Sequence, residues 1–527
     1  MNAAQRQAVL DNARYLRQVR PIDPDEIFEY VSGQPHPAAV RQVLREEAPA
    51  LGLIEREDGT FVPVAEEPLA VSPAPVEALP ARHAQAVEDL LVDAFGPDWA
   101  EGESGERLRS RIREIKRQYL AGEPVEYDEL TALGYAVYHL PATYAAARAL
   151  LADLAVEGRL GRDLRVLDVG AGVGGQALAL FDLLPADALV DYHAVEPGAG
   201  ADVFEALAAE SGRNVYSTVH RDPVEAHEPT GEFDLVVFAN VLSELAAPGA
   251  VVTALLDSLA ADGTVLALAP ADRNTAIGLR EVERAVEAET GATVYAPTCR
   301  LWPGETPTST CWSFDRRRPL AVPDVQARLD DAGAGDGEFV NVDVQFAYSV
   351  LRTDGATRID TRPSPDRFAS MAESERHVTD RIDLVGVKLS HDLAAAGPAR
   401  DDTGGADRGA GQSAPRASAT GGSGRSGGSG RSGGAGGARR SGGAGDDANP
   451  VYLVGDGSEA VDHFAVRTEA TSLNDALVDA AYGQALVFEG ALVLWNDDEG
   501  AYNLVVDGET VVDAVPGPLW DARKAVR

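Results

Sequence analysis

The sequence predicts an α/β protein whose core is a doubly wound, mostly parallel sheet of the Rossmann-like kind. From residue 164 onward, short apolar runs typical of strands alternate with apolar helical segments, which is the pattern of parallel strands joined by crossover helices. A glycine-rich turn, LDVGAGVGG at 167–175, follows the first run and opens a helix. Acidic or amide side chains follow the next three runs. We expect this α/β domain to occupy residues 161–360.

The expected strands of the sheet are buried runs bounded by turns. In chain order they are LRVLDVGAG, ALVDYHAVEP, RNVYSTVHRD, FDLVVFANVL, GTVLALAP and GATVYAP.

Residues 1–64 predict a winged-helix-like domain. Helices are expected over 3–17 and 23–32 and within PHPAAVRQVLREEA, followed by a hairpin that turns at Asp58-Gly59. A winged helix commonly reads nucleic acid, but this copy is not basic, so a docking or structural role is the other interpretation. A proline-rich linker at 65–83 and a helical region at 84–160 follow.

The C-terminal part predicts a small β-rich domain that begins at 361–392 and resumes at 450–527. Its short strands and Asp-Gly and Glu-Gly turns indicate a small barrel, OB-like in arrangement. The glycine-, serine- and arginine-rich stretch 393–449 lacks the apolar residues that would offset its ordering entropy, so we expect a disordered linker. Its arginines could contact RNA, or the stretch could be a plain tether.

Composition limits the class of protein. A chain of 527 residues exceeds one ordinary core. The net charge of −38, spread over every segment, with only three lysines, resembles a halophile's acidic surface. The two cysteines exclude a disulfide scaffold. Without a signal peptide or an 18-residue apolar run, we expect a soluble, cytoplasmic protein and no membrane partner.

Polar residues at the strand ends predict a nucleotide-like cofactor. The glycines permit a tight turn and close backbone approach, and an acidic residue after the second strand suits both ribose hydroxyls. A P-loop lysine is absent, which argues against a triphosphate. The expected cofactor-binding residues are Asp168, Gly170, Gly172, Gly174, Glu196, Asp222 and Asn240.

In this order the motifs resemble class I S-adenosylmethionine-dependent methyltransferases, and the resemblance implies S-adenosylmethionine as cofactor, with a dinucleotide as the alternative. The segment after the fourth strand lacks the Asn-Pro-Pro-aromatic motif of base amino-group methylation. Cys299, in Pro297-Thr298-Cys299, offers a nucleophile for carbon-5 methylation, but no second acid or base is identifiable, so the catalytic residues stay unknown.

A more specific resemblance covers about residues 105–390. YAVYHLPATYAAARALL, LDVGAGVGG, FDLVVFANVLSEL, YAPTC, CWSFDRRR and VQFAYSVLR together resemble the methyltransferase-like family associated with the small ribosomal subunit, which includes mitochondrial assembly factors and bacterial relatives. The resemblance implies binding to the small subunit or its ribosomal RNA during assembly. It leaves open a ribosomal RNA methyltransferase or a non-catalytic factor with a vestigial or sensing pocket.

Two basic segments are the expected RNA contacts. The helix RLRSRIREIKRQYL places Arg109, Arg113 and Lys116 on its polar faces, and the triplet Arg316, Arg317 and Arg318 follows an aromatic loop. Such residues pair with phosphates and stack on unpaired bases. The alternative is that these side chains are solvated or paired with neighbouring carboxylates.

Both cysteines, Cys299 and Cys311, lie in one loop at 296–319. The small-subunit family carries four cysteines proposed to bind an iron–sulfur cluster, and the resemblance places these two at the first and third positions. Two thiolates do not complete an iron–sulfur or zinc site. The loop is therefore expected to be a metal loop without its metal, a site completed by other ligands, or a redox pair or nucleophile.

Overall fold

The computed structural model describes residues 1–395 and 449–517. These form two compact units. Of the described residues, unit 1 comprises 1–297, 314–358 and 516–517, and unit 2 comprises 298–313, 359–395 and 449–515. The predicted linker, 393–449, lies almost entirely outside the described residues. No helix in the described ranges is long and apolar enough to cross a membrane.

Unit 1 begins with a small helical region that carries a two-stranded hairpin. The hairpin turns at Asp58-Gly59 as expected, where the Asp58 carboxylate accepts from the Thr60 amide at 3.0 Å. Ile22 forms an isolated antiparallel β-bridge with Phe61 and so extends the hairpin by one short strand-like segment. Helices followed by such a hairpin are a winged-helix-like arrangement. Its elements are α1 (Ala3–Leu16), α2 (Pro24–Ile27), η1 (Phe28–Tyr30), α3 (Pro37–Glu46), α4 (Ala48–Leu51), β1 (Leu53–Glu55) and β2 (Phe61–Pro63).

Four helices lie between the hairpin and the central sheet in the sequence. The Asp128 side chain accepts from the Thr131 amide and so caps the third of them, because a helix leaves its first amides without backbone partners. Its neighbour contains almost only apolar residues and is buried over most of its length. The helices are α5 (Ala81–Phe95), α6 (Gly102–Ala121), α7 (Glu129–Tyr138) and α8 (Leu140–Val156).

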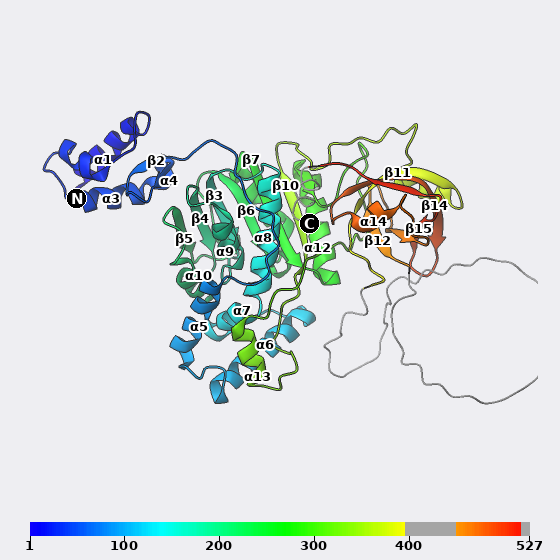
Figure 1. The fold of residues 1–527 in the computed structure, drawn as a ribbon, viewed down its shortest axis with the longest axis horizontal. Helices are drawn as coiled ribbons and strands as arrows, with labels where there is room; N and C mark the ends of the chain where they lie inside the picture. Colours follow the sequence, from blue (N-terminus) through cyan, green and yellow to red (C-terminus); the bar gives the residue numbers. More distant parts are fainter. Residues whose placement is uncertain (396–448, 518–527) are drawn as a thin grey trace, which may run out of the picture. The chain divides into compact units, whose positions relative to one another are not determined.

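The central sheet has the strand order β5-β4-β3-β6-β7-β10-β8, and β9 pairs with β10 (Figure 1). The strands from β5 to β7 are parallel, whereas β10 runs antiparallel to both β7 and β8. This doubly wound order confirms the predicted sheet. The strands are β3 (Asp163–Val169), β4 (Leu189–Val195), β5 (Val215–His220), β6 (Phe233–Ala239), β7 (Leu259–Pro270), β8 (Thr293–Ala296), β9 (Asp315–Arg316) and β10 (Gln345–Arg352).

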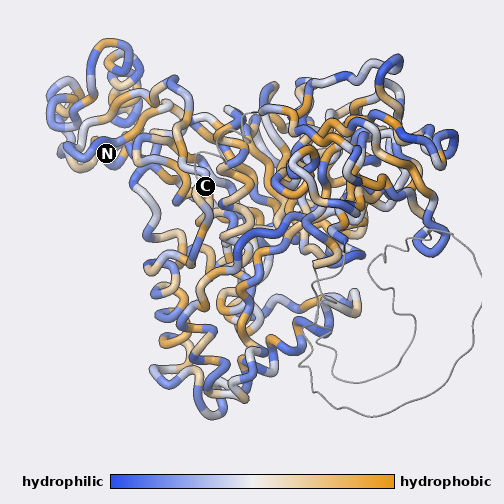
Figure 2. Tube along the Cα trace, turned by 45° about the vertical axis from the view of Figure 1, so that its right-hand side comes forward, coloured by the Kyte–Doolittle hydropathy of each residue, from blue (hydrophilic) through white to orange (hydrophobic). Residues whose placement is uncertain are grey.

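Helices cover both faces of this sheet, and hydrophobic segments, in orange, run through the central part of the trace in Figure 2. Side chains of α8 and α9 pack on one face against β4, β6 and β7, and α11 and α12 contribute to the core on the other. From β3 the chain adds β4 and β5 on one side and then returns to place β6 and β7 on the other side of β3, so the topological switch point lies between β3 and β6. The connecting elements are α9 (Gly175–Leu183), α10 (Gly200–Ala208), η2 (Val224–Ala226), η3 (Leu242–Glu244), α11 (Pro248–Leu255), η4 (Leu256–Ser258), α12 (Arg273–Thr290) and α13 (Asp324–Asp331).

Unit 2 contains a closed five-stranded barrel. Its strands pair in the order β11-β12-β13-β15-β14, and β14 pairs back with β11. β13 and β15 are parallel, and a short helix connects β13 to β14. This topology confirms the predicted OB-like barrel whose first strand precedes the linker. The elements are η5 (Met371–His377), β11 (Arg381–Lys388), β12 (Val451–Gly455), β13 (His463–Arg467), α14 (Asp475–Asp479), β14 (Ala485–Asn496), β15 (Ala501–Val506) and β16 (Val511–Ala514).

The cysteine loop differs from its expected placement at the end of the methyltransferase-like sheet. Residues 298–313 belong to unit 2, where the Leu301 amide donates to Asp456 O at 3.1 Å. The Cys311 amide donates to the Asp462 carboxylate at 3.0 Å. Backbone and carboxylate acceptors of the barrel satisfy the loop's amides, so the loop is a structural part of the barrel unit.

Candidate cofactor-binding site

A cavity of about 490 Å³ opens at the carboxyl ends of the parallel strands of unit 1. This volume is in the range of pockets that enclose one small ligand. Its wall comes from the glycine turn after β3, the ends of β4, β6 and β7, the helices before the sheet, and the segment that leads into β10. The polar and aromatic residues in the wall are Tyr119, Tyr127, Tyr135, His139, Thr143, Gln176, Glu196, Glu225, Asn240, Glu244, Asn341, Asp343, Gln345 and Phe346.

The three predicted glycines have different roles in the turn. A Cβ on Gly170 would lie 2.5 Å from a Val241 methyl, and one on Gly174 would lie 2.5 Å from the Phe204 ring. These two glycines therefore allow the turn to pack against its own domain. Gly172 has φ +55, and a Cβ there would meet no atom within 4 Å. Because Gly172 lines the cavity, the open space beside it is where a ligand approaches the backbone.

Glu196 lies at the end of β4, as predicted, and its side chain faces the same turn. The carboxylate accepts from the Gly172 amide and from the Gly198 amide, both at 2.8 Å. The residue is 7% exposed and lines the cavity. An acidic side chain held in this way presents its remaining lone pairs to hydroxyl donors.

Asp168 does not line the cavity, so it holds the glycine turn, as its place at the strand end allows, and does not contact the ligand space. It is fully buried and accepts from Tyr192 Oη at 2.6 Å and from Gln176 Nε2 at 2.9 Å. Gln176 Nε2 also donates to Ala171 O at 3.0 Å, so Asp168 positions the glycine turn through Gln176. Burial raises the pKa of Asp168 to about 7, and the nearby Glu196 adds to the increase.

The remaining two predicted residues are separated by the fold. Asn240 lines the cavity at the end of β6 with φ +61. Asp222 is exposed, and its carboxylate lies 3.5 Å from His227 Nδ1. The residues that follow it, Pro223, Val224 and Glu225, form the wall instead. Asp222 itself is not among the residues that line the cavity.

Several residues in the wall were not predicted from the sequence. Tyr127 Oη donates to Glu244 at 2.8 Å and lies 3.4 Å from Tyr135 Oη. His139 lies against Tyr135, with ring centroids 4.7 Å apart. Burial, with a contribution from Lys116, lowers the pKa of His139 to about 4, so its imidazole is neutral at pH 7. For Tyr135 and His139 the sequence signal was the concentration of aromatic residues in YAVYHLPATY at 135–144, a stretch that does not include Tyr127.

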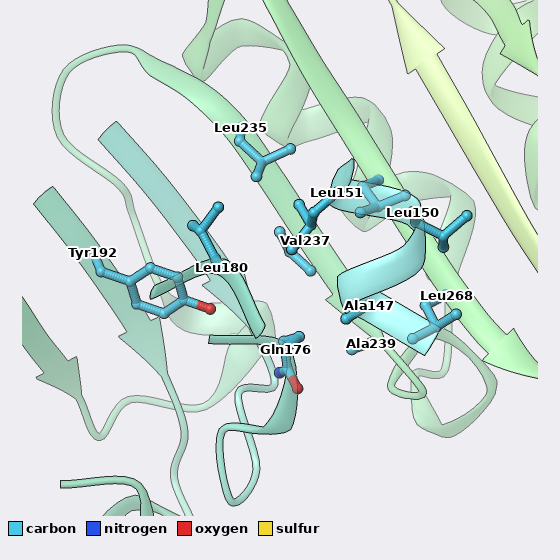
Figure 3. Close-up of a pocket in the computed structure, with 11 residues that line it drawn as sticks. Ala147, Leu150, Leu151, Gln176, Leu180, Tyr192, Leu235, Val237, Ala239 and Leu268 are labelled. Carbon is cyan, nitrogen blue, oxygen red and sulfur yellow. The ribbon is translucent and has the colours of Figure 1, made fainter. Parts of the chain in front are cut away.

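A second, apolar cavity lies in the core between α8 and the sheet (Figure 3). Its volume is about 10 Å³, and leucine, alanine and valine side chains form most of its wall. A space of this size holds at most one water molecule. The candidate ligand site is therefore the larger cavity.

The predicted RNA contacts on α6 are engaged within unit 1. Arg109 is buried and donates to Ala100 O at 3.0 Å, so it is not available to a phosphate. Arg113 forms two bonds of 2.8 Å with the Glu338 carboxylate, and Lys116 donates to Glu338 O at 2.7 Å. Internal acceptors thus engage all three predicted side chains, and Arg113 is paired with a carboxylate as in the alternative interpretation of this helix.

The arginine triplet begins at the last residue of β9, and its members differ in exposure. Arg317 pairs with Asp315 at 2.7 Å and with Asp153 at 3.3 Å, which raises its pKa although burial opposes the shift. The Arg317 guanidinium group is therefore engaged in ion pairs within unit 1. Arg316 and Arg318 are exposed and remain the accessible members of the triplet.

The structure gives no support for a metal at the cysteines. Cys299 and Cys311 are buried free thiols, and burial raises the pKa of Cys299 well above its ordinary value, which disfavours the thiolate that metals and electrophiles require. Within 1–395 and 449–517, no three His, Cys, Asp or Glu side chains gather so as to hold a metal ion.

Three family models match parts of the chain. Residues 138–322 match a model described as "Methyltransferase domain". Residues 6–57 match the N-terminal domain, and residues 436–515 the C-terminal domain, of a family described as "Domain of unknown function (DUF8157)". No curated protein matches the chain.

Solved methyltransferase structures resemble parts of the chain at low identity. They include the sugar N-methyltransferase KedS8 from Streptoalloteichus, at 20% identity over 24% of this chain and 47% of that one, with a TM-score of 0.20. The mitomycin 7-O-methyltransferase MmcR is 16% identical over 51% and 75%, with a TM-score of 0.24. Magnesium protoporphyrin IX methyltransferase (ChlM) from Synechocystis is 13% identical over 51% and 97%, with a TM-score of 0.26.

The chain spans about half the length of the first of these structures. Because all three TM-scores lie below 0.5, these structures do not identify a methyl acceptor for this chain. The fold follows from the strand order, the antiparallel β10 and the match to the methyltransferase domain model. Unit 1 therefore contains a class I S-adenosylmethionine-dependent methyltransferase core, preceded by a helical region, and unit 2 is a β-rich domain with a five-stranded barrel.

Proposed function

We propose that unit 1 binds S-adenosylmethionine in the 490 Å³ cavity and transfers its methyl group to an acceptor. The observation that carries the proposal is the combination of Gly172 and Glu196 in one wall. Open space beside Gly172 admits a ligand against the backbone, and the Glu196 carboxylate is oriented by two backbone amides. These features fit an adenosyl group whose ribose hydroxyls donate to Glu196.

When bound, S-adenosylmethionine supplies an electrophilic methyl group on a positively charged sulfur. The protein residues hold and orient the reactants: Gly172 allows close approach, and Asp168 holds the turn through Gln176. Asn240 and Glu244 lie after β6, at the edge of the sheet where ligands of this fold bind. The alternative function is a non-catalytic factor whose pocket senses the cofactor.

Substitution of Gly172 tests the cofactor site. Gly172→Ala adds a methyl group to the ligand space, and we expect S-adenosylmethionine affinity measured by calorimetry to fall by about tenfold or more, which corresponds to about 1.4 kcal/mol. The matched control is Gly158→Ala. Gly158 has a similar φ of +69 and also has open space around it, so the control carries the same backbone strain without touching the cavity.

Equal affinity of Gly172→Ala and Gly158→Ala for S-adenosylmethionine would contradict the placement of the ligand beside Gly172. If the unmodified protein gives no heat of binding with S-adenosylmethionine, the proposal that it binds this cofactor fails. If binding occurs, transfer of a tritiated methyl group separates the enzyme from the sensing factor. No transfer to cell extract, RNA or protein, despite tight binding, would favour the sensor.

Association with the small ribosomal subunit is a second proposal, which rests on the resemblance of the motif series from 135 to 352. The exposed pair Arg316 and Arg318 favours it, because adjacent exposed guanidinium groups suit phosphates. Internal contacts engage Arg109, Arg113 and Lys116 of α6, and this weakens the case for a broad RNA surface. A ribosomal RNA methyltransferase and an assembly factor both require this association.

Charge reversal at the exposed arginines tests the ribosomal proposal. We expect Arg316→Glu/Arg318→Glu to reduce co-sedimentation with small subunits, and to lower the slope of log affinity against log salt by about 1.5, because two phosphate contacts are lost. The control reverses Arg14 and Arg376, whose side chains are 57% and 73% exposed. If the unmodified chain does not sediment with small subunits at any salt concentration, the proposal fails.

A further inference from the structure

The charge of the cavity wall limits the chemistry of what enters it. Four carboxylates line the cavity, and among the described residues in its wall there is no lysine or arginine. The carboxylates are Glu196, Glu225, Glu244 and Asp343. An acceptor of net negative charge would enter this space against four like charges and without a lysine or arginine in the wall. A ligand of net positive charge would be attracted, and S-adenosylmethionine is one, because its sulfonium and ammonium groups outweigh its single carboxylate.

Three aromatic rings stand in sequence at the side of the cavity formed by the helices before the sheet. The Tyr127 and Tyr135 ring centroids are 5.6 Å apart, and those of Tyr135 and His139 are 4.7 Å apart. Tyr127 Oη binds Glu244 at 2.8 Å. All three rings and Glu244 line the same cavity. Aromatic rings and a carboxylate in one wall can bind an ammonium group, because ring faces carry negative potential.

His139 is compatible with a cation in this place. Burial, with a contribution from Lys116, lowers its pKa to about 4, so the ring is uncharged at neutral pH and does not repel an ammonium group. Lys116 itself is not among the residues that line the cavity, and its ammonium group donates to Glu338 O at 2.7 Å and lies over the Tyr138 ring. In the part of the chain that the structure describes, no side chain or backbone group forms a hydrogen bond with its ring nitrogens. They are therefore available to a ligand.

We propose that Tyr127, Tyr135, His139 and Glu244 form an amine-recognition cage, and that the methyl acceptor is an amine-bearing group that enters without phosphate or carboxylate beside the nitrogen. The choice of acceptor class rests on the proposed methyltransferase function. The cage itself is a binding site that can be measured without the cofactor.

Three probes of one shape test the cage. Benzylamine is cationic at pH 7, benzyl alcohol is neutral and benzoate is anionic. We expect calorimetry on the full-length protein without cofactor to give benzylamine affinity about tenfold above that of benzyl alcohol, since cation–π contacts contribute on the order of a tenfold factor. Benzoate and inorganic phosphate should not bind. Benzoate or phosphate binding as tight as that of benzylamine would overturn the proposal.

Variants assign the binding to the cage. Tyr135→Phe keeps the ring and should leave benzylamine affinity within about twofold, whereas Tyr135→Leu and Glu244→Gln should each weaken it about tenfold. Glu126→Gln is the control, because Glu126 is exposed and outside the cavity wall. Unchanged affinity in both Tyr135→Leu and Glu244→Gln would contradict the cage, and circular dichroism verifies that each variant is folded.

The two proposals fail independently. Benzylamine binding without S-adenosylmethionine binding would reject the methyltransferase function and retain the cage. S-adenosylmethionine binding with no preference for benzylamine over benzyl alcohol would reject the cage and retain the cofactor site.

Discussion

Glu196→Gln is expected to weaken S-adenosylmethionine binding by roughly 10- to 100-fold. The substitution keeps the size of the side chain but replaces a charged acceptor, and a hydrogen bond to a charged group contributes about 1.5–3 kcal/mol. In the structure the Glu196 carboxylate accepts from the Gly172 and Gly198 amides at 2.8 Å. The amide of glutamine has one oxygen instead of two and cannot accept from both amides and from a ribose.

Isothermal calorimetry measures this change. The control is Glu205→Gln, which removes one charge from the exposed face of α10, where Glu205 pairs with Arg221 at 3.1 Å. We expect the control to bind within about twofold of the unmodified protein, because exposed charges at this distance are screened by salt. An equal loss in both variants would mean that net charge, rather than the position of Glu196, determines affinity.

Asp168→Asn is expected to remove a pH dependence from the stability of unit 1. Asp168 is fully buried, and its pKa is raised from 3.8 to about 7, chiefly by burial. The folded state therefore holds a proton that the unfolded state releases between these two values. The stability from this carboxyl is fully present below pH 3.8 and is lost as pH rises to about 7.

The size of this loss follows from the two pKa values. About three pH units at about 1.4 kcal/mol each correspond to roughly 4 kcal/mol. The asparagine side chain of the variant cannot ionise, so the difference in stability between the variant and the unmodified protein should move in favour of the variant as pH rises from 4 to 7. His139, whose lowered pKa has the opposite effect below pH 6.5, is common to both proteins and cancels in this difference.

Hydrogen exchange of peptides from β3 and β4, corrected for intrinsic exchange rates, measures this stability within unit 1. Asp187→Asn is the control, because the Asp187 side chain is 57% exposed and pairs with Arg162. A difference between Asp168→Asn and the unmodified protein that is constant from pH 4 to 7 would show that Asp168 does not carry a proton in the folded state. Such a pH-independent difference in stability would come only from the changed hydrogen bond between residue 168 and Gln176.

Local patterns predicted much of the fold. Apolar runs separated by helical segments led to the sheet, because a parallel strand buried on both faces needs a continuous apolar sequence. The turn at Asp58-Gly59 and the strands on both sides of 393–449 led to the hairpin and the barrel in the same way. The glycine turn and Glu196 were also predictable, since their positions follow directly from strands that end in a turn.

The site residues that were missed come from segments far from the turn in the sequence. Tyr127, Tyr135 and His139 reach the cavity only because their helices pack beside the sheet, and Asp343 arrives more than 170 residues after Gly170. No spacing rule connects such positions. The burial of Asp168, rather than its contact with a ligand, likewise depends on which face of β3 the helices cover.

The charged side chains and the cysteine loop show the same difference between what local sequence patterns determine and what tertiary contacts determine. The sequence by itself determined the class I core, the glycine turn with Glu196, and the barrel whose first strand precedes residues 393–449, because apolar periodicity and turn chemistry act between near neighbours. Only the tertiary structure decided that Arg109 and Arg317 are internal partners, that the cysteine loop belongs to the barrel unit, and that aromatic rings and carboxylates share one cavity. Those outcomes depend on which distant side chains meet, and pairing and burial then set their charge, exposure and chemistry.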